Sequence, residues 1–320
     1  MSQRILLTGG SGFVGRRMAG ALEARFPDAR RLAIYRDADS WHLDAWEASH
    51  TDLTDALAVD AMISRFKPTH VVHLAAQSSV GGSIQAGEAT WNSNFIGTFN
   101  LARSLVRYGQ PSVFLFASTV EVYGDSFRNG KVFENTAPMP SNPYSAAKLA
   151  AEWMLADILP QGCHLIITRS VNHSGPGQDT RFVLPSFAMQ IAKIEASGKE
   201  GCLLVGNLDA ERDFLHVDDV IDAYSKLIEI APSLAPRILV NVASGKVWKI
   251  ASLLKLLVGM SKLPLKIVQD PNRMRASDIP IAQVDFERLN ILTGWVPKTS
   301  VNEMLVEILH SARKMHEKAS

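Results

Sequence analysis

Short apolar runs alternate with longer segments of helical periodicity over roughly the first 170 residues of the chain. The runs that predict strands are Arg4–Thr8, Arg31–Tyr35, His70–Leu74, Ser112–Ala117 and His164–Thr168. The segments that predict helices are Gly12–Arg25, Leu53–Arg65, Ala89–Tyr108 and Tyr144–Leu159. Because helices of this length can connect parallel strands, the alternation predicts an α/β fold with a doubly wound parallel sheet.

The regular alternation weakens after Asn172, where shorter and mixed elements follow. Loops are expected at Ser174–Arg181, Gly206–Asp213 and Asp270–Pro280. We therefore predict a parallel-sheet domain over residues 1–170 and a smaller mixed α/β lobe over residues 171–320, with some later segments returning to the first domain.

Composition and charge exclude several classes of partner. The 33 Lys and Arg residues almost balance the 32 Asp and Glu residues, so neither a nucleic acid nor an anionic membrane is expected to bind. The first residues enter a strand almost at once, and no apolar segment approaches the about 18 residues of a membrane span. A cytoplasmic location is therefore expected. Cys163 and Cys202 lie in or beside apolar runs, which predicts two buried, reduced thiols, and no metal site is expected.

A glycine-rich turn follows the first predicted strand. Gly9, Gly12 and Gly15 are spaced so that the chain can turn tightly and bring its amides close to a pyrophosphate at the start of a helix. Phe13 and Val14 stand within the same motif. This position between a strand and a helix predicts a Rossmann-type site for a dinucleotide.

The second predicted strand ends in Tyr35-Arg36-Asp37, where the adenosine ribose is expected. A guanidinium at Arg36 could pair with a 2′-phosphate and favours NADP(H), whereas Asp37 leaves NAD(H) possible and a surface role for Arg36 is the alternative. Asp52 and Leu53 could flank the adenine, although Asp52 could equally cap a helix.

Tyr144 and Lys148 are four residues apart, which places both on one face of a helix. A nearby ammonium stabilises a phenolate, so Lys148 could lower the pKa of Tyr144 for acid–base catalysis. Thr119 and Glu121 follow the fourth predicted strand, where the Thr119 hydroxyl could hold a reacting oxygen.

These motifs, in this order, resemble the extended short-chain dehydrogenase/reductase family, which includes the NAD-dependent epimerases and dehydratases. The likeness covers essentially the whole chain, and the segments His73–Gln77 and Asn94–Thr98 also fit it. The resemblance implies a cofactor site that includes Gly9, Gly12, Phe13, Val14, Gly15, Arg36, Asp52, Leu53, Leu74, Ala75, Ala76, Tyr144 and Lys148. It also implies the catalytic residues Thr119, Tyr144, Lys148 and Glu121.

The C-terminal half resembles reductases of GDP-4-keto-6-deoxy-D-mannose. The similar segments are Asn172–Gln178, Phe182-Val183, Gly206–Phe214, Gln269–Asp278 and Thr293–Pro297. The resemblance makes residues 171–320 a substrate lobe and implies substrate contacts from Gln77, Ser78, Glu121, Asn172, Val183, Asn207, Arg212, Arg275 and Asp278. One departure is the run Arg169-Ser170-Val171-Asn172, where the family has proline and an aromatic ring before the asparagine.

The resemblance implies reduction of the C4 ketone of a GDP-linked 4-keto-6-deoxy sugar to GDP-D-rhamnose or GDP-6-deoxy-D-talose. Two alternatives stay open. GDP-mannose 4,6-dehydratases carry a glutamate at the position of Glu121, and a non-catalytic, cofactor-sensing regulator could use the same fold. The family also implies a homodimer formed by a bundle of the helices Ala89–Tyr108 and Tyr144–Leu159.

Overall fold

The computed structural model describes residues 3–35, 44–109, 111–274 and 279–319. A seven-stranded parallel sheet organises the first lobe, with the strand order β10-β6-β5-β4-β1-β2-β3. The predicted doubly wound fold is therefore confirmed. The strands of this sheet are β1 (Arg4–Thr8), β2 (Arg30–Tyr35), β3 (Glu47–His50), β4 (His70–His73), β5 (Val113–Thr119), β6 (His164–Ser170) and β10 (Arg237–Val242).

Helices cover both faces of the sheet because its strands are apolar on both sides. One face packs against α1 (Phe13–Arg25), α8 (Val217–Ile230) and α10 (Glu287–Thr293). The other face packs against α2 (Ala56–Phe66), α5 (Gly97–Ser104) and α6 (Pro143–Ile158). On α1, Met18 and Leu22 are fully buried, and each such side chain contributes about 1.5–3 kcal/mol.

The predicted helix Ala89–Tyr108 is a run of four pieces rather than one α-helix. These are α4 (Gly87–Trp91), the π-helical η1 (Asn92–Ile96), α5 and the π-helical η2 (Leu105–Gly109). The short helix α3 (Val80–Gln85) precedes them. Asn94 is buried in the first π-helical turn, where its side chain accepts from the amide of Gln77 at 2.7 Å and donates to the Gln77 carbonyl at 3.0 Å. The π turn thus ties this helix to the loop after β4.

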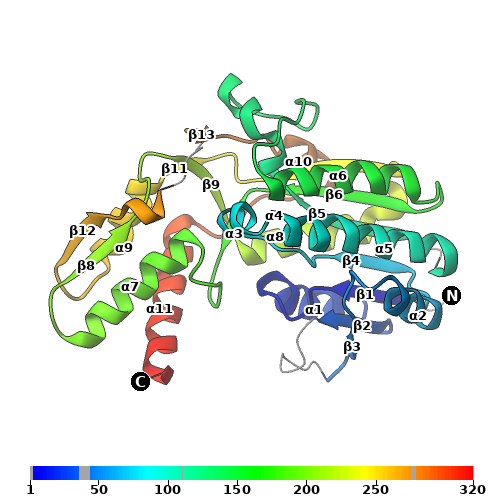
Figure 1. Ribbon diagram of the computed structural model, residues 1–320, viewed down its shortest axis with the longest axis horizontal. Coiled ribbons are helices and arrows are strands. Elements are labelled where there is room, and N and C mark those ends of the chain that lie inside the picture. The colour runs from blue at the N-terminus through cyan, green and yellow to red at the C-terminus, as the bar shows by residue number, and fades with distance from the viewer. Residues whose placement is uncertain (1–2, 36–43, 110, 275–278, 320) are drawn as a thin grey trace.

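The second lobe stands beside the sheet, to the left in Figure 1. Its core lies among the helices α7 (Val183–Ser197), α9 (Ile250–Gly259) and α11 (Val301–Ala319). Its strands are β7 (Asn172–Ser174), β8 (Gly201–Val205), β9 (Glu211–His216), β11 (Val247–Lys249), β12 (Leu265–Gln269) and β13 (Ile281–Ala282). Within the described residues, the 3₁₀ segments are η3 (Val120–Asn129), η4 (Ala231–Ser233) and η5 (Pro271–Arg273).

The two lobes are joined where β6 of the first lobe continues into β7 of the second. β6 ends at Ser170, the buried Val171 follows, and β7 then pairs with β9. The amide of Val171 still donates to the carbonyl of Val242 at the end of β10. Some later segments of the chain belong to the first lobe. These are β10, α8 and α10, which pack in its core.

The two cysteines differ, which corrects the prediction that both are buried. Cys163 lies in the core before β6, and burial raises the pKa of its thiol to about 12. Cys202 lies on β8, a strand of a two-stranded sheet with one open face, and is exposed. Across the described residues, no helix combines the length and the apolar character needed to cross a membrane.

Candidate active site

A cavity of about 910 Å³ opens at the carboxyl ends of the parallel strands. It includes the crevice between β1 and β4, where the strand order reverses and ligands of doubly wound sheets bind. It continues between the lobes to the start of α7 and the loop before β9. The predicted site residues that line it are Gly9, Gly12, Phe13, Val14, Gly15, Asp52, Leu53, Leu74, Ala75, Ala76, Gln77, Ser78, Thr119, Glu121, Tyr144, Asn172, Val183, Asn207 and Arg212.

The glycine turn packs closely against neighbouring backbone, which leaves no room for a Cβ at Gly9 or Gly15. Gly9 has φ +71°, and a Cβ there would lie 2.9 Å from the amide nitrogen of Ala75. A Cβ on Gly15 would lie 2.0 Å from the Gly9 carbonyl oxygen, so α1 packs directly on the turn. Gly12 caps α1, and among the described residues no acidic side chain stands in the first helical turn. The amide dipoles there favour an anion such as a pyrophosphate.

A buried histidine fixes the end of β4 beside this turn. The Nδ1 atom of His73 lies 2.6 Å from the Thr8 hydroxyl oxygen, and Nε2 lies 2.9 Å from that of Thr98. The Thr8 hydroxyl also accepts from the amide of Ala75 at 3.1 Å. Burial, aided by the charge of Lys148, lowers the pKa of His73 to about 3. His73 is therefore a neutral structural group that aligns the segment from Leu74 along the cavity.

The adenosine end of the predicted site is described only in part. Asp52 and Leu53 line the cavity, and the Asp52 carboxylate accepts from the amide and the hydroxyl of Thr54. The cap of α2 is Asp55, which accepts from two amides of the first turn, so the capping alternative for Asp52 is wrong. Arg36 lies outside the described residues, and its pairing with a 2′-phosphate stays an expectation.

Thr119 and Tyr144 meet at the centre of the cavity. Thr119 ends β5, and Tyr144 lies in the first turn of α6, which begins with Pro143 after the capping side chain of Asn142. Both side chains line the cavity, and the Thr119 oxygen accepts from the amide of Glu121 at 3.2 Å. Burial raises the pKa of Tyr144, the Thr119 hydrogen bond lowers it, and the charge of Glu121 raises it. Tyr144 is therefore a protonated phenol in this structure.

Lys148 lies below the cavity floor, one turn of α6 after Tyr144. Its ammonium donates to the Ala117 carbonyl at 2.8 Å and lies 4.6 Å from the centre of the Phe116 ring. Burial lowers the pKa of Lys148 to about 7, while the charge of Glu152 raises it. The expected influence of Lys148 on the Tyr144 pKa stays a prediction.

The second lobe supplies the opposite wall. Asn172 begins β7, Val183 begins α7, and Asn207 lies in the loop before β9. Arg212 on β9 is held by hydrogen bonds to the carbonyls of Glu211 at 2.9 Å and Ile279 at 2.6 Å. The other two predicted substrate residues, Arg275 and Asp278, lie outside the described part of the chain.

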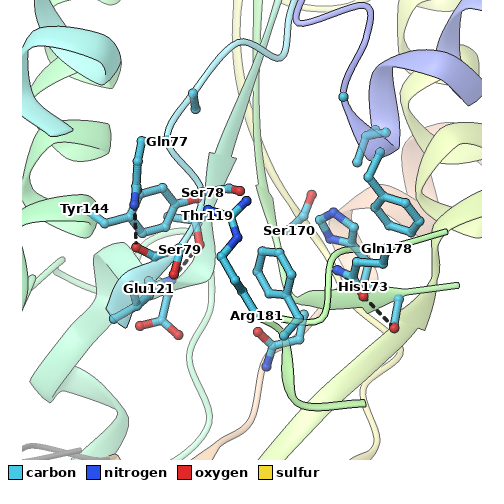
Figure 2. Close-up of a pocket in the computed structure, with 18 of the residues that line it drawn as sticks. Gln77, Ser78, Ser79, Thr119, Glu121, Tyr144, Ser170, His173, Gln178 and Arg181 are labelled. Atoms are coloured by element: carbon cyan, nitrogen blue, oxygen red, sulfur yellow. Dashed lines mark hydrogen bonds between the residues drawn. The ribbon is translucent and has the colours of Figure 1, made fainter. Parts of the chain in front are cut away.

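Several lining residues were not predicted as site residues. In the view of Figure 2, Arg181 stands between the wall of Tyr144 and Thr119 and the wall of Ser170 and His173. Arg181 belongs to an expected loop, and its Nε atom lies 3.1 Å from Asp179. Other unpredicted polar residues of the lining include Ser170, His173, Gln178 and Arg273. The repeated arginine of the Arg273-Met274-Arg275 run was the available signal for Arg273.

The comparisons with known proteins agree with this geometry. The sequence signature of a family described as GDP-mannose 4,6 dehydratase matches residues 6–308. GDP-6-deoxy-D-mannose reductase of Pseudomonas aeruginosa is 34% identical, with 97% of each chain covered. GDP-6-deoxy-D-talose 4-dehydrogenase of Aggregatibacter actinomycetemcomitans is 29% identical and covers 95% of this chain and 96% of its own. The structure of RMD from P. aeruginosa complexed with NADPH has a TM-score of 0.81 and 32% identity, and the match covers 98% of this chain and 100% of that chain.

The glycine turn, the hydroxyl pair and the doubly wound sheet define an enzyme of the NAD(P)-dependent oxidoreductase class, of the extended short-chain dehydrogenase/reductase type. Within that class, the chain belongs to the GDP-mannose 4,6 dehydratase family of NAD-dependent epimerases and dehydratases. The resemblance expected from the sequence is thereby confirmed.

Proposed function

We propose that the protein is a ketoreductase that uses NADPH, or NADH, to reduce C4 of a GDP-linked 4-keto-6-deoxy sugar. The observation that carries the proposal is that the hydroxyl-bearing side chains of Thr119 and Tyr144 line one cavity, which runs from the glycine turn to Arg212. The sequence identity between this chain and a GDP-6-deoxy-D-mannose reductase supports the choice of sugar. The product is GDP-D-rhamnose or GDP-6-deoxy-D-talose, and the expected cytoplasmic location remains part of the proposal.

The hydroxyl groups of Tyr144 and Thr119 have different roles at the C4 ketone of the sugar. A bound reduced nicotinamide would supply the hydride that C4 accepts. Tyr144 donates its Oη proton to the C4 oxygen, and Thr119 donates a hydrogen bond to the same oxygen as negative charge develops there. Both donors are fixed before the substrate arrives, because Thr119 ends a buried strand and Tyr144 lies in a capped helical turn.

The other proposed site residues hold the two ligands. Lys148 would hold the nicotinamide ribose from below, and the glycine turn would hold the pyrophosphate. Arg212 would bind the diphosphate of the sugar, because guanidinium groups form directional, often bidentate hydrogen bonds with phosphate. Asn172 and Val183 would contact the sugar. In this proposal, residues before about 170 bind the dinucleotide and residues after it bind the sugar substrate.

A second candidate function is a 4,6-dehydratase. Glu121 favours it, because this carboxylate lines the cavity two residues after Thr119 and could abstract a proton near C5 of the sugar. A dehydratase would oxidise C4, eliminate water and then reduce C6 with the same cofactor, so it consumes no cofactor overall. The third possibility, a cofactor-sensing regulator, would bind the dinucleotide and turn over no sugar.

An absorbance assay tests the proposal. With GDP-4-keto-6-deoxy-D-mannose, we expect the protein to oxidise one NADPH or NADH for each sugar reduced, and NMR of the product should show an alcohol at C4. Conversion of GDP-mannose without loss of NADPH absorbance would support the dehydratase and contradict the reductase. NADPH binding without turnover of either sugar would support the regulator.

We also propose that a second copy of this chain covers the helices α4 to η2 and α6. These helices expose the large apolar side chains Trp91, Ile96, Val106, Tyr108 and Trp153. Trp153, on α6, is 63% exposed, so Trp153→Glu should convert a dimer to a monomer by light scattering. The matched change Ile291→Glu, at an exposed apolar residue of α10, should leave the dimer intact. A monomeric wild type, or a dimeric Trp153→Glu variant, would contradict this interface.

A further inference from the structure

A buried carboxylate lies one helical turn beyond Lys148 and outside the cavity. Glu152 on α6 is 3% exposed, and its carboxylate accepts from the hydroxyl of Ser118. It also accepts from Arg169, whose Nε lies 3.0 and 3.2 Å from the two carboxylate oxygens and whose Nη2 lies 2.6 Å from one of them. A buried ion pair of this kind seldom stabilises a fold more than apolar side chains would, so another role for it is worth testing.

The carboxylate joins the three elements that carry the proposed catalytic groups. Ser118 precedes Thr119 on β5, and Arg169 on β6 is the register partner of Ser118. Glu152 itself shares α6 with Tyr144 and Lys148. The Arg169 guanidinium is buried and stacks 4.8 Å from the centre of the Tyr123 ring, so the pair cannot rotate away towards solvent.

The Lys148 ammonium is buried to 2% exposure, where a positive charge is costly unless a negative charge lies near it. Glu152 is the carboxylate on the next turn of the same helix. We infer that Glu152 is a positioning residue whose carboxylate keeps the Lys148 ammonium protonated beneath the cavity and so sets the pH range in which the dinucleotide binds. The inference rests on the proposed role of Lys148 as the group that holds the nicotinamide ribose.

The other groups that face Lys148 do not titrate in the neutral range. Tyr144, on the same helix, stays protonated because burial raises its pKa. His73, from β4, stays neutral because burial lowers its pKa to about 3. From β5 come the uncharged Ala117 carbonyl and Phe116 ring, and from β6 comes Arg169, whose charge is paired with Glu152. Burial lowers the pKa of Lys148 to about 7 and the charge of Glu152 raises it, so we expect this pKa to fall further when that charge is removed.

The test measures NADPH affinity from pH 5 to 10 by nicotinamide fluorescence. Affinity should fall as pH rises through the Lys148 pKa. We call this loss of affinity at high pH the alkaline limb of the binding curve. Glu152→Gln should move the alkaline limb to lower pH by about one unit or more, because Arg169 remains without its counter-charge. Arg169→Gln should move the limb to higher pH, because Glu152 then acts on Lys148 alone. The double variant Glu152→Gln/Arg169→Gln should lie between Glu152→Gln and the wild type.

The alkaline limb should move in opposite directions in the Glu152→Gln and Arg169→Gln variants, and this difference distinguishes a positioning role from a purely structural one. If Glu152 and Arg169 only hold the fold together, each variant lowers affinity or stability and the limb stays in place, which would overturn the inference. The matched control is Glu195→Gln, which breaks another carboxylate–arginine pair, 2.7 Å from Arg313 in the second lobe, and should not move the limb. The double variant removes both partners of the Glu152–Arg169 pair together, so neither is left buried without its counter-charge, and it carries the test if a single variant fails to fold. Because the readout is NADPH binding, it stands even if no GDP sugar is turned over.

Discussion

Replacing Tyr144 with phenylalanine should lower turnover of the 4-keto sugar by about 10²–10⁴-fold, because the C4 oxygen loses its proton donor. Thr119 would still donate to that oxygen, which leaves a small residual rate. NADPH affinity should change little, since the phenyl ring keeps its place in the first turn of α6. Steady-state kinetics and a fluorescence titration of NADPH check the two halves of this expectation.

The matched control is Tyr123→Phe. Tyr123 is also a buried tyrosine, and its hydroxyl donates to the side chain of Asn241 at 2.8 Å, away from the cavity. Its loss should cost about 0.5–1.5 kcal/mol of stability and leave the kinetic constants close to those of the wild type. Near-full activity of the Tyr144→Phe variant would remove Tyr144 from the catalytic role.

Replacing Gly15 with alanine should abolish dinucleotide binding and destabilise the first lobe. The new Cβ would lie 2.0 Å from the Gly9 carbonyl oxygen, so α1 has to move away from the turn that it packs against. Overpacking of this kind typically costs about 1–3 kcal/mol, and contact with rigid backbone puts this case at the upper end. Thermal melts and NADPH titration measure the two losses.

Gly20 on the same helix supplies the control. A Cβ at Gly20 meets no atom within 4 Å, and the residue is exposed. Gly20→Ala should therefore raise stability by about 0.8–1 kcal/mol through helix propensity alone and leave NADPH binding unchanged. If Gly15→Ala bound NADPH as the wild type does, the glycine turn would not be the pyrophosphate site.

The first lobe could be predicted from the sequence because local patterns and burial agree there. β1 is where the apolar run placed it, and the predicted strand Arg31–Tyr35 is β2 with one residue added. The π-helical turns could not be predicted, because only packing against the loop after β4 requires Asn94 to face Gln77. The exposure of Cys202 was missed because β8 pairs with β12 alone and has one open face.

The candidate site could be predicted where a motif fixes the backbone. Thr119 and Tyr144 meet because the end of a strand and the start of a helix bring them together. Arg181 and His173 were missed because their approach to the cavity depends on the path of a loop and on the pairing of β7 with β9. The position of Lys148 under the floor also depends on the packing depth of α6, which periodicity does not give.

The continuity of β6 into β7 limits how the two lobes can move. A hinge at Val171 would have to break its hydrogen bond to Val242 and pull a buried side chain out of the core. Bending at that point therefore costs free energy, and we expect the two lobes to keep their relative orientation at this connection. The width of the active-site cavity is then set by the sheet. We therefore expect this width to stay nearly constant when a ligand binds, without closure of one lobe on the other.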